Sequence, residues 1–531
     1  MQTVSQSWKN AHKQTLLNES FVEVSLDIAD PESIADASAN DNGAVYISDT
    51  SKVVKMSDSE AIPYNTLEQN VWLLDGNRKA IPVDDNKDGG YVGDVLSNDE
   101  GFFVDKTPTI TINFTRVFEK IIPGITIFWG TAYNEFATDF VVTAYNGDAV
   151  VARKEVANNK AVISAVEMDI VNYDRITIQV VRWCLPDHRA RVDEVFIGWH
   201  KVYSKSNLLS YSHTQSIDPV STSLPKMEIK FSIDNSDNSY NPYNLSGLAK
   251  YLTERQEVVA RYGLKVNGNT VEWIKGGSFY LSEWYAKQNG ISAEFVARDL
   301  LGFMSAEYND EMWNGSERSL YEIALQVLNK AELPLNSDGS VKWVIDTSLK
   351  TFYTKARLPL DTMANCLQMI ANAGRCVLYP NRDSILHIAP INNEPTDYKI
   401  DYFRSYSRPE ITLSKPLKAV AVKVYQYVMG DDGVESSTTD VVIPIADEGE
   451  VITIDNPLIT DGGNASSLGE WVGNYLKNRM TLTSEERADV RLDALDIVEN
   501  KNDYGKNNVR MTNVEFTFNG AFRCTGEGRV I

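Results

Sequence analysis

Residues 227–263, MEIKFSIDNSDNSYNPYNLSGLAKYLTERQEVVARYG, decide the fold of this 531-residue chain. The first seven residues alternate apolar and polar side chains, which is the period of a half-buried β-strand. Asp234 and Asn235 suit an Asx turn that ends the strand, and Pro242 fixes the next bend because its φ is locked. The segment 258–263 is a second apolar run. The stretch therefore predicts antiparallel strands joined by an ordered loop.

The same alternation continues outward in both directions, and short turn signals such as Asn146-Gly147 separate the runs. Further alternating runs begin at Ile110, Ile125, Ile176 and Ile291. Helical i, i+3, i+4 spacing of apolar residues is found instead in 319–333, 361–375 and 466–480. Ser319 and Glu322 predict a capping box at the start of the first helix, and Asp361 is the expected N-cap of the second. The sequence therefore predicts a mainly β chain with a minor α+β part.

Charge and composition exclude several classes of protein. The chain has 51 Lys and Arg against 73 Asp and Glu, and 51 − 73 gives a net charge of −22. Binding to a nucleic-acid backbone needs clustered positive charge, so we expect none. There is no apolar stretch of the length that crosses a membrane, and the polar N-terminus lacks the apolar core of a signal peptide. We therefore expect synthesis in a cytoplasm and no membrane span. The four cysteines are too scattered for a disulfide framework or a zinc site.

Catalytic motifs are absent from the sequence. It contains no HExxH, GxSxG, Walker loop or GxGxxG after a strand, and its five histidines have no patterned partner nearby. The sequence therefore predicts no catalytic residue, no cofactor and no enzyme. The alternative is a triad or a carboxylate pair that converges only in space, which sequence spacing does not reveal.

One loop has metal-ligand spacing. Asp84, Asn86 and Asp88, followed by Gly89, match the opening of a calcium loop, in which alternating oxygens converge on the ion. The twelfth position is Val95, which offers no carboxylate. These three residues are calcium candidates, and a solvated turn is the alternative interpretation.

A group of aromatic and cationic residues in loop-like stretches suggests sugar binding. The candidates are Trp72, Tyr91, Arg182, Trp183 and His188. Aromatic faces stack on sugar rings, and the planar Arg fork hydrogen-bonds to hydroxyls or acidic sugars. The alternative for each aromatic residue is a place in the core or at its rim.

Residues 227–263 resemble the tail hub proteins of siphophage-type and prophage-encoded particles. The residues that carry the resemblance are Ile233–Asp237, the element Tyr240-Asn241-Pro242, and Arg255-Gln256 leading into 258–263. The match continues through GGSFYLSEW and FVARDLLGFM. The segment 361–388 resembles the helix and hairpin of a hub's middle domain, and 508–531 resembles its closing β-domain.

The resemblance implies four domains. A first hub β-barrel is formed by 1–40 and 200–300, an α+β middle domain by 301–409, and a C-terminal hub β-domain by 410–531. Residues 41–199 resemble a jelly-roll-like, galactose-binding (discoidin-like) β-sandwich inserted into the first barrel. TPTITINF, GITIFW, FVVTAYNGD and YDRITIQV carry that resemblance.

A hub implies a homotrimer at the tail tip of a virion, made in the cytoplasm of the host bacterium. Two barrels per chain would mimic a sixfold ring that joins the tail tube to a threefold tip. Expected partners are the tail tube or distal tail protein, a spike or fibre, and host cell-surface polysaccharide through the sandwich. The alternatives are a carbohydrate-binding adhesin of the particle and a cell-wall hydrolase.

Overall fold

The computed structural model describes residues 1–14, 18–40, 42–54, 64–68, 71–72, 90–268, 270–287, 290–336, 339–400, 404–430 and 433–531. They form two compact units, and each is described by itself. The large unit comprises Met1–Val24, Tyr203–Asn241 and Glu257–Ile531. The sandwich unit comprises Ser25–Val202 and Pro242–Gln256.

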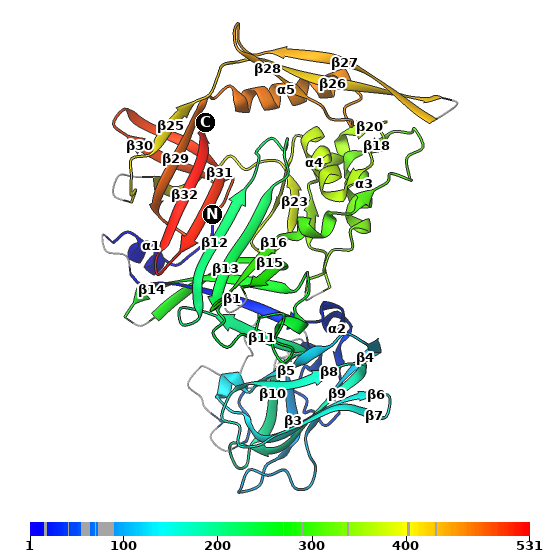
Figure 1. The fold of residues 1–531 in the computed structure, drawn as a ribbon, viewed down its shortest axis with the longest axis vertical. Coiled ribbons are helices and arrows are strands. Elements are labelled where there is room, and N and C mark those ends of the chain that lie inside the picture. Colours follow the sequence, from blue (N-terminus) through cyan, green and yellow to red (C-terminus); the bar gives the residue numbers. More distant parts are fainter. Residues whose placement is uncertain are drawn as a thin grey trace. The chain divides into compact units, whose positions relative to one another are not determined.

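A long antiparallel sheet path dominates the large unit, in the order β14-β15-β16-β13-β12-β31-β32-β29-β25 (Figure 1). Strand β1, of which Ser20–Val24 belong to this unit, is the neighbour of β14. These strands are β1 (Ser20–Ala29), β12 (Leu208–Ser216), β13 (Lys226–Asp234), β14 (Glu257–Asn267), β15 (Thr270–Ala286), β16 (Ser292–Arg298), β25 (Glu410–Leu413), β29 (Met480–Arg487), β31 (Gly505–Phe518) and β32 (Phe522–Val530). Strand β30 (Ile497–Asn502) branches from β31 and carries β24 (Pro395–Ile400). The short helix α1 (Gln6–His12) packs beside β14.

The first part of residues 227–263 folds as expected. Met227, Ile229, Phe231 and Ile233 of β13 are buried, because alternate residues of a strand point to one face. The side-chain oxygen of Asn235 accepts a hydrogen bond from the backbone N–H of Tyr240 at 2.9 Å and so closes the loop after the strand. The predicted strand and ordered loop are confirmed.

Strands far apart in the sequence meet where β12 pairs with β31. The register runs antiparallel from Tyr211 opposite Phe518 to Ser216 opposite Asn513. This pairing joins the strands that follow residue 208 to those that precede the C-terminus in one sheet.

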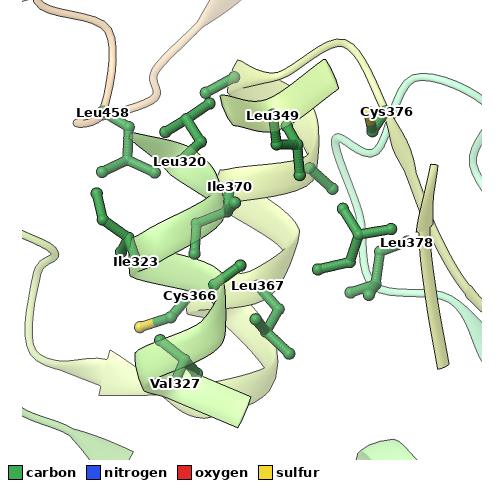
Figure 2. Close-up of a cluster of buried hydrophobic side chains, with 14 of the residues drawn as sticks. Leu320, Ile323, Val327, Leu349, Cys366, Leu367, Ile370, Cys376, Leu378 and Leu458 are labelled. Atoms are coloured by element: carbon green, nitrogen blue, oxygen red, sulfur yellow. The ribbon is translucent and has the colours of Figure 1, made fainter. Parts of the chain in front are cut away.

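Two helices and several short strands form the middle of the large unit. They are α3 (Leu320–Lys330), α4 (Met363–Ala373), β17 (Glu307–Tyr308), β18 (Arg318–Ser319), β19 (Trp343–Ile345), β20 (Tyr353–Thr354), β21 (Asp361–Thr362), β22 (Val377–Pro380) and β23 (Leu386–Ala389). Figure 2 shows the apolar stripes of both helices in one core. The capping box of Ser319 and Glu322 is confirmed. The expected N-cap Asp361 is wrong, because the Thr362 hydroxyl accepts from the Asn365 N–H instead.

A three-stranded sheet covers the third helix, α5 (Gly462–Leu476). Its order is β27-β26-β28, with β26 (Leu417–Gly430), β27 (Gly433–Pro444) and β28 (Glu450–Ile454). Gly469 and Gly473 let the helix approach closely, since a Cβ at Gly469 would lie 2.3 Å from the Ile443 side chain. The helix begins at Gly462, four residues before the predicted stretch, and Asp461 is its N-cap.

The sandwich unit consists of two facing sheets, of orders β3-β10-β5-β8 and β2-β4-β9-β6-β7. The strands are β2 (Ser38–Ala39), β3 (Tyr91–Leu96), β4 (Thr109–Phe118), β5 (Ile122–Trp129), β6 (Ala137–Asn146), β7 (Ala149–Val156), β8 (Ile163–Ile170), β9 (Tyr173–Trp183) and β10 (Arg189–Phe196). Helix α2 (Pro31–Asp36) precedes them, and β11 (Gly198–Tyr203) follows them in the chain. Ile125 and Ile127 of one sheet share a core with Ile176 and Ile178 of the other.

The mainly β fold class is confirmed. The predicted domain boundaries, and the galactose-binding-like character of 41–199, stay predictions.

Candidate functional site

Three loops meet at one end of the sandwich, where Arg182, Trp183 and His188 lie, three of the five predicted sugar-binding residues. They follow β3, β5 and β9. The Ser97 hydroxyl donates to the Leu185 carbonyl at 2.8 Å, and the Trp183 indole Nε1 donates to the Glu135 carboxylate at 2.9 Å. The first bond links the loop after β3 to the loop after β9, and the second links the end of β9 to the loop after β5.

Three of the five sugar-binding candidates lie in the core. Tyr91, Trp183 and His188 are buried, and Trp183 packs edge-on against Trp129 with 6.0 Å between ring centroids. A buried ring has no open face on which a sugar could stack. The structure thus gives these three residues the alternative role, that of core residues.

The other two candidates are accessible. Trp72 is 49% exposed. Arg182 is half-buried, with its Nε donating to the Glu100 carbonyl at 3.0 Å and its guanidinium 4.9 Å from the centre of the Phe102 ring. A sugar-binding proposal can rest only on Trp72 and Arg182.

A buried cluster of charges underlies the loop end of the sandwich. The Arg191 guanidinium lies 2.5 Å from a Glu68 oxygen and 3.4 Å from a Glu135 oxygen. His188 Nδ1 lies 3.1 Å from the other Glu135 oxygen. All four side chains are buried. Buried charges persist only when they are paired, and here a guanidinium between two carboxylates supplies the pairing.

The cluster shifts the pKa values of its members. Burial opposes ionisation of Glu68, but the attraction of Arg191 prevails and lowers the pKa of that carboxyl. Burial likewise opposes protonation of His188, but the hydrogen bond and charge of Glu135 raise the pKa of the imidazole. The Glu68 carboxyl and the Arg191 guanidinium are therefore both ionised at neutral pH.

Glu68 also fastens its own segment to the sandwich. Its second oxygen accepts from the Arg189 backbone N–H at 2.9 Å. Four residues earlier, the Tyr64 N–H donates to the Tyr133 hydroxyl, which donates back to the Tyr64 carbonyl, both at 2.8 Å. Glu68 and Glu135 could not be predicted from the sequence, because isolated acidic residues carry no motif.

A second buried polar centre lies in the large unit. His213 Nδ1 lies 2.7 Å from the Tyr262 hydroxyl, which lies 2.8 Å from the Tyr211 hydroxyl. Phe279 and Phe516 pack against the imidazole. Burial lowers the pKa of His213 to about 3, so the ring is neutral.

Two cysteine thiols of the large unit are unreactive at neutral pH. Burial raises the pKa of the Cys366 and Cys376 thiols to about 12, so neither is a thiolate at neutral pH.

In the part of the chain that the structure describes, no three His, Cys, Asp or Glu side chains gather as metal ligands. The calcium candidates Asp84, Asn86 and Asp88 lie outside the described residues. No helix in the described ranges is long and apolar enough to span a membrane.

Comparison with known proteins gives structural matches alone. No protein-family model matches the sequence, and no curated protein gives a significant match. The chain is similar in structure to a tail protein from Neisseria meningitidis MC58, at 10% identity and a TM-score of 0.40, over 62% of this chain and 93% of the other.

It is also similar to a 43 kDa tail protein of prophage MuSo2 from Shewanella oneidensis, at 11% identity and a TM-score of 0.40, over 62% and 94% of the two chains. A third match is a prophage tail protein from Listeria monocytogenes EGD-e, at 11% identity and a TM-score of 0.37, over 62% and 91%. Each of the three is described as a tail protein.

Proposed function

We propose that this protein is a non-catalytic structural hub of a bacteriophage tail tip, acting as a homotrimer that joins the tail tube to the tip apparatus. The observation that carries the proposal is the β12–β31 pairing. It joins one group of strands, β14-β15-β16-β13-β12, to a second group, β31-β32-β29-β25, in one chain. Two strand groups per chain give six in a trimer, and six match a sixfold tube. The described ionisable clusters are buried and paired, which suits a building role.

The tail-tip assignment is tested on intact particles. Immunogold labelling with an antibody to this chain should place it at the tail tip, and labelling elsewhere on the particle would contradict the hub role. Mass photometry of the purified full chain should give a trimer. A strict monomer at micromolar concentration would remove the ring from the proposal.

A second role, contact with host polysaccharide through the sandwich, is favoured by the exposed ring of Trp72 and by Arg182, which is half-buried. Stacking and hydrogen bonding by such groups is how proteins hold sugars. Host envelope polysaccharide should retain the full chain on a column, and Trp72→Ala should reduce retention severalfold. Tyr504→Ala, which removes an exposed ring on the large unit, is the matched control. Equal retention of both variants would exclude this role for Trp72.

A further inference from the structure

A cleft of about 640 Å³ opens in the large unit beside α5. One side is lined by Ile452, Thr453 and Ile454 of β28. Among the described residues, β28 pairs only with β26, and Figure 1 shows it at the margin of its sheet. Consecutive strand residues point to opposite faces, so lining by three of them places the unpaired edge of β28 at the cleft. An unpaired edge offers backbone donors and acceptors to another strand.

Another part of the cleft lining is a polar row across three neighbouring strands. Ser216 of β12 lies opposite Asn513 of β31, which lies opposite Glu527 of β32. The Asn513 side-chain oxygen is buried and accepts no hydrogen bond from the described residues.

The charges around the cleft are predominantly negative. Glu527 is exposed and forms no ion pair with the described residues. Among the described residues, the Asp218 carboxylate accepts only from groups of its own loop, Val220 and Thr222.

Asp455 also lines the cleft but is paired with Lys423 at 2.5 Å. The Arg529 guanidinium lies over the Tyr475 ring, which itself lines the cleft, and donates to the Asn478 carbonyl at 2.6 Å. Glu527 and Asp218 are thus the lining carboxylates that no cation of the described residues pairs with. A basic side chain would complement this surface.

We propose that the cleft receives an extended, basic segment of a second protein, which adds as a strand to the free edge of β28. Main-chain hydrogen bonds to β28 supply the affinity, and the carboxylates of Glu527 and Asp218 select a lysine or arginine. A second copy of this chain is the alternative occupant, and the dependence of binding on chain concentration separates the two. The proposal does not depend on the particle in which the chain resides.

The test uses the full chain and a labelled synthetic decapeptide of alternating Thr and Val with one central Lys, measured by fluorescence anisotropy. We expect saturable binding, at least tenfold weaker binding when Glu replaces the Lys, and loss of binding when alternate backbone nitrogens along one edge are methylated. Failure of the Lys peptide to bind, or equal binding of the methylated peptide, would overturn strand addition.

Two charge-reversal variants of the chain test whether the Lys peptide binds in this cleft. Glu527→Lys should weaken the Lys peptide about tenfold, whereas Asp148→Lys, the same charge change in an exposed turn of the sandwich unit, should leave it unchanged. Hydrogen exchange should show the β28 amides protected only when peptide is present. Equal effects of the two variants would contradict the proposed cleft. Protection that rises with chain concentration without peptide would identify a second copy as the occupant and overturn the proposal.

Discussion

The sandwich unit and the large unit bury polar groups in opposite ways. In the sandwich, Arg191 is ionised between the carboxylates of Glu68 and Glu135. In the large unit, His213 is neutral beside the Tyr262 hydroxyl. Pairing offsets desolvation with attraction between charges, whereas neutrality avoids much of the desolvation cost. The two centres should therefore respond differently to mutation and to pH.

The largest effect is expected from breaking the ionic centre. Arg191→Met leaves two buried carboxylates without their cation and should lower the free energy of unfolding of the sandwich unit by about 4–5 kcal/mol. Calorimetry of the full chain would measure this. Arg153→Met, on the exposed strand β7 of the same unit, is the matched control and should change stability by under about 1 kcal/mol. Equal effects would show that the buried pairs are unimportant.

The neutral centre should be sensitive to acid. The pKa of His213 is about 3 in the folded chain and near 6.5 when unfolded, so its contribution to stability is complete above pH 6.5 and is lost as the pH falls toward 3. Between pH 6.5 and 4 the loss should be about 3 kcal/mol. Denaturant titrations across this range, compared with His213→Gln, measure it. A wild-type pH slope identical to that of the variant would disprove a neutral His213.

Asp299 sharpens the comparison, because it is a buried acid without a buried cation beside it. Burial raises its pKa to about 6, although the N–H groups of Leu301 and Met227 donate to it at 2.8 Å. A raised carboxyl pKa stabilises the fold below the unfolded pKa near 3.8, and that stability is lost as the pH rises toward 6. The loss between pH 4 and 5.5 should be about 2 kcal/mol. Asp299→Asn should abolish this slope, and chemical denaturation at stepped pH would show whether it does.

The smallest effect is expected from one hydroxyl of the neutral centre. Tyr262→Phe removes the hydrogen-bond partner of both His213 and Tyr211 and should cost about 1–2 kcal/mol. Tyr504→Phe, whose ring is fully exposed, should cost almost nothing. Urea denaturation of both variants compares them directly, and a Tyr262→Phe chain as stable as wild type would mean that these bonds contribute nothing net.

The sequence alone specified the local structure. Apolar alternation in 227–233 determines a half-buried strand, and the Ser319–Glu322 pair determines a helix start, because both depend on residues a few positions apart. The mainly β fold followed from such patterns.

Tertiary structure decided which polar and aromatic residues are buried and what they contact. Trp183 and His188 looked like surface residues in a loop, yet the facing sheets enclose them. Arg191 meets Glu68 across 123 positions of sequence. No local pattern encodes such a contact, because it arises only when the strands that carry the residues have packed together.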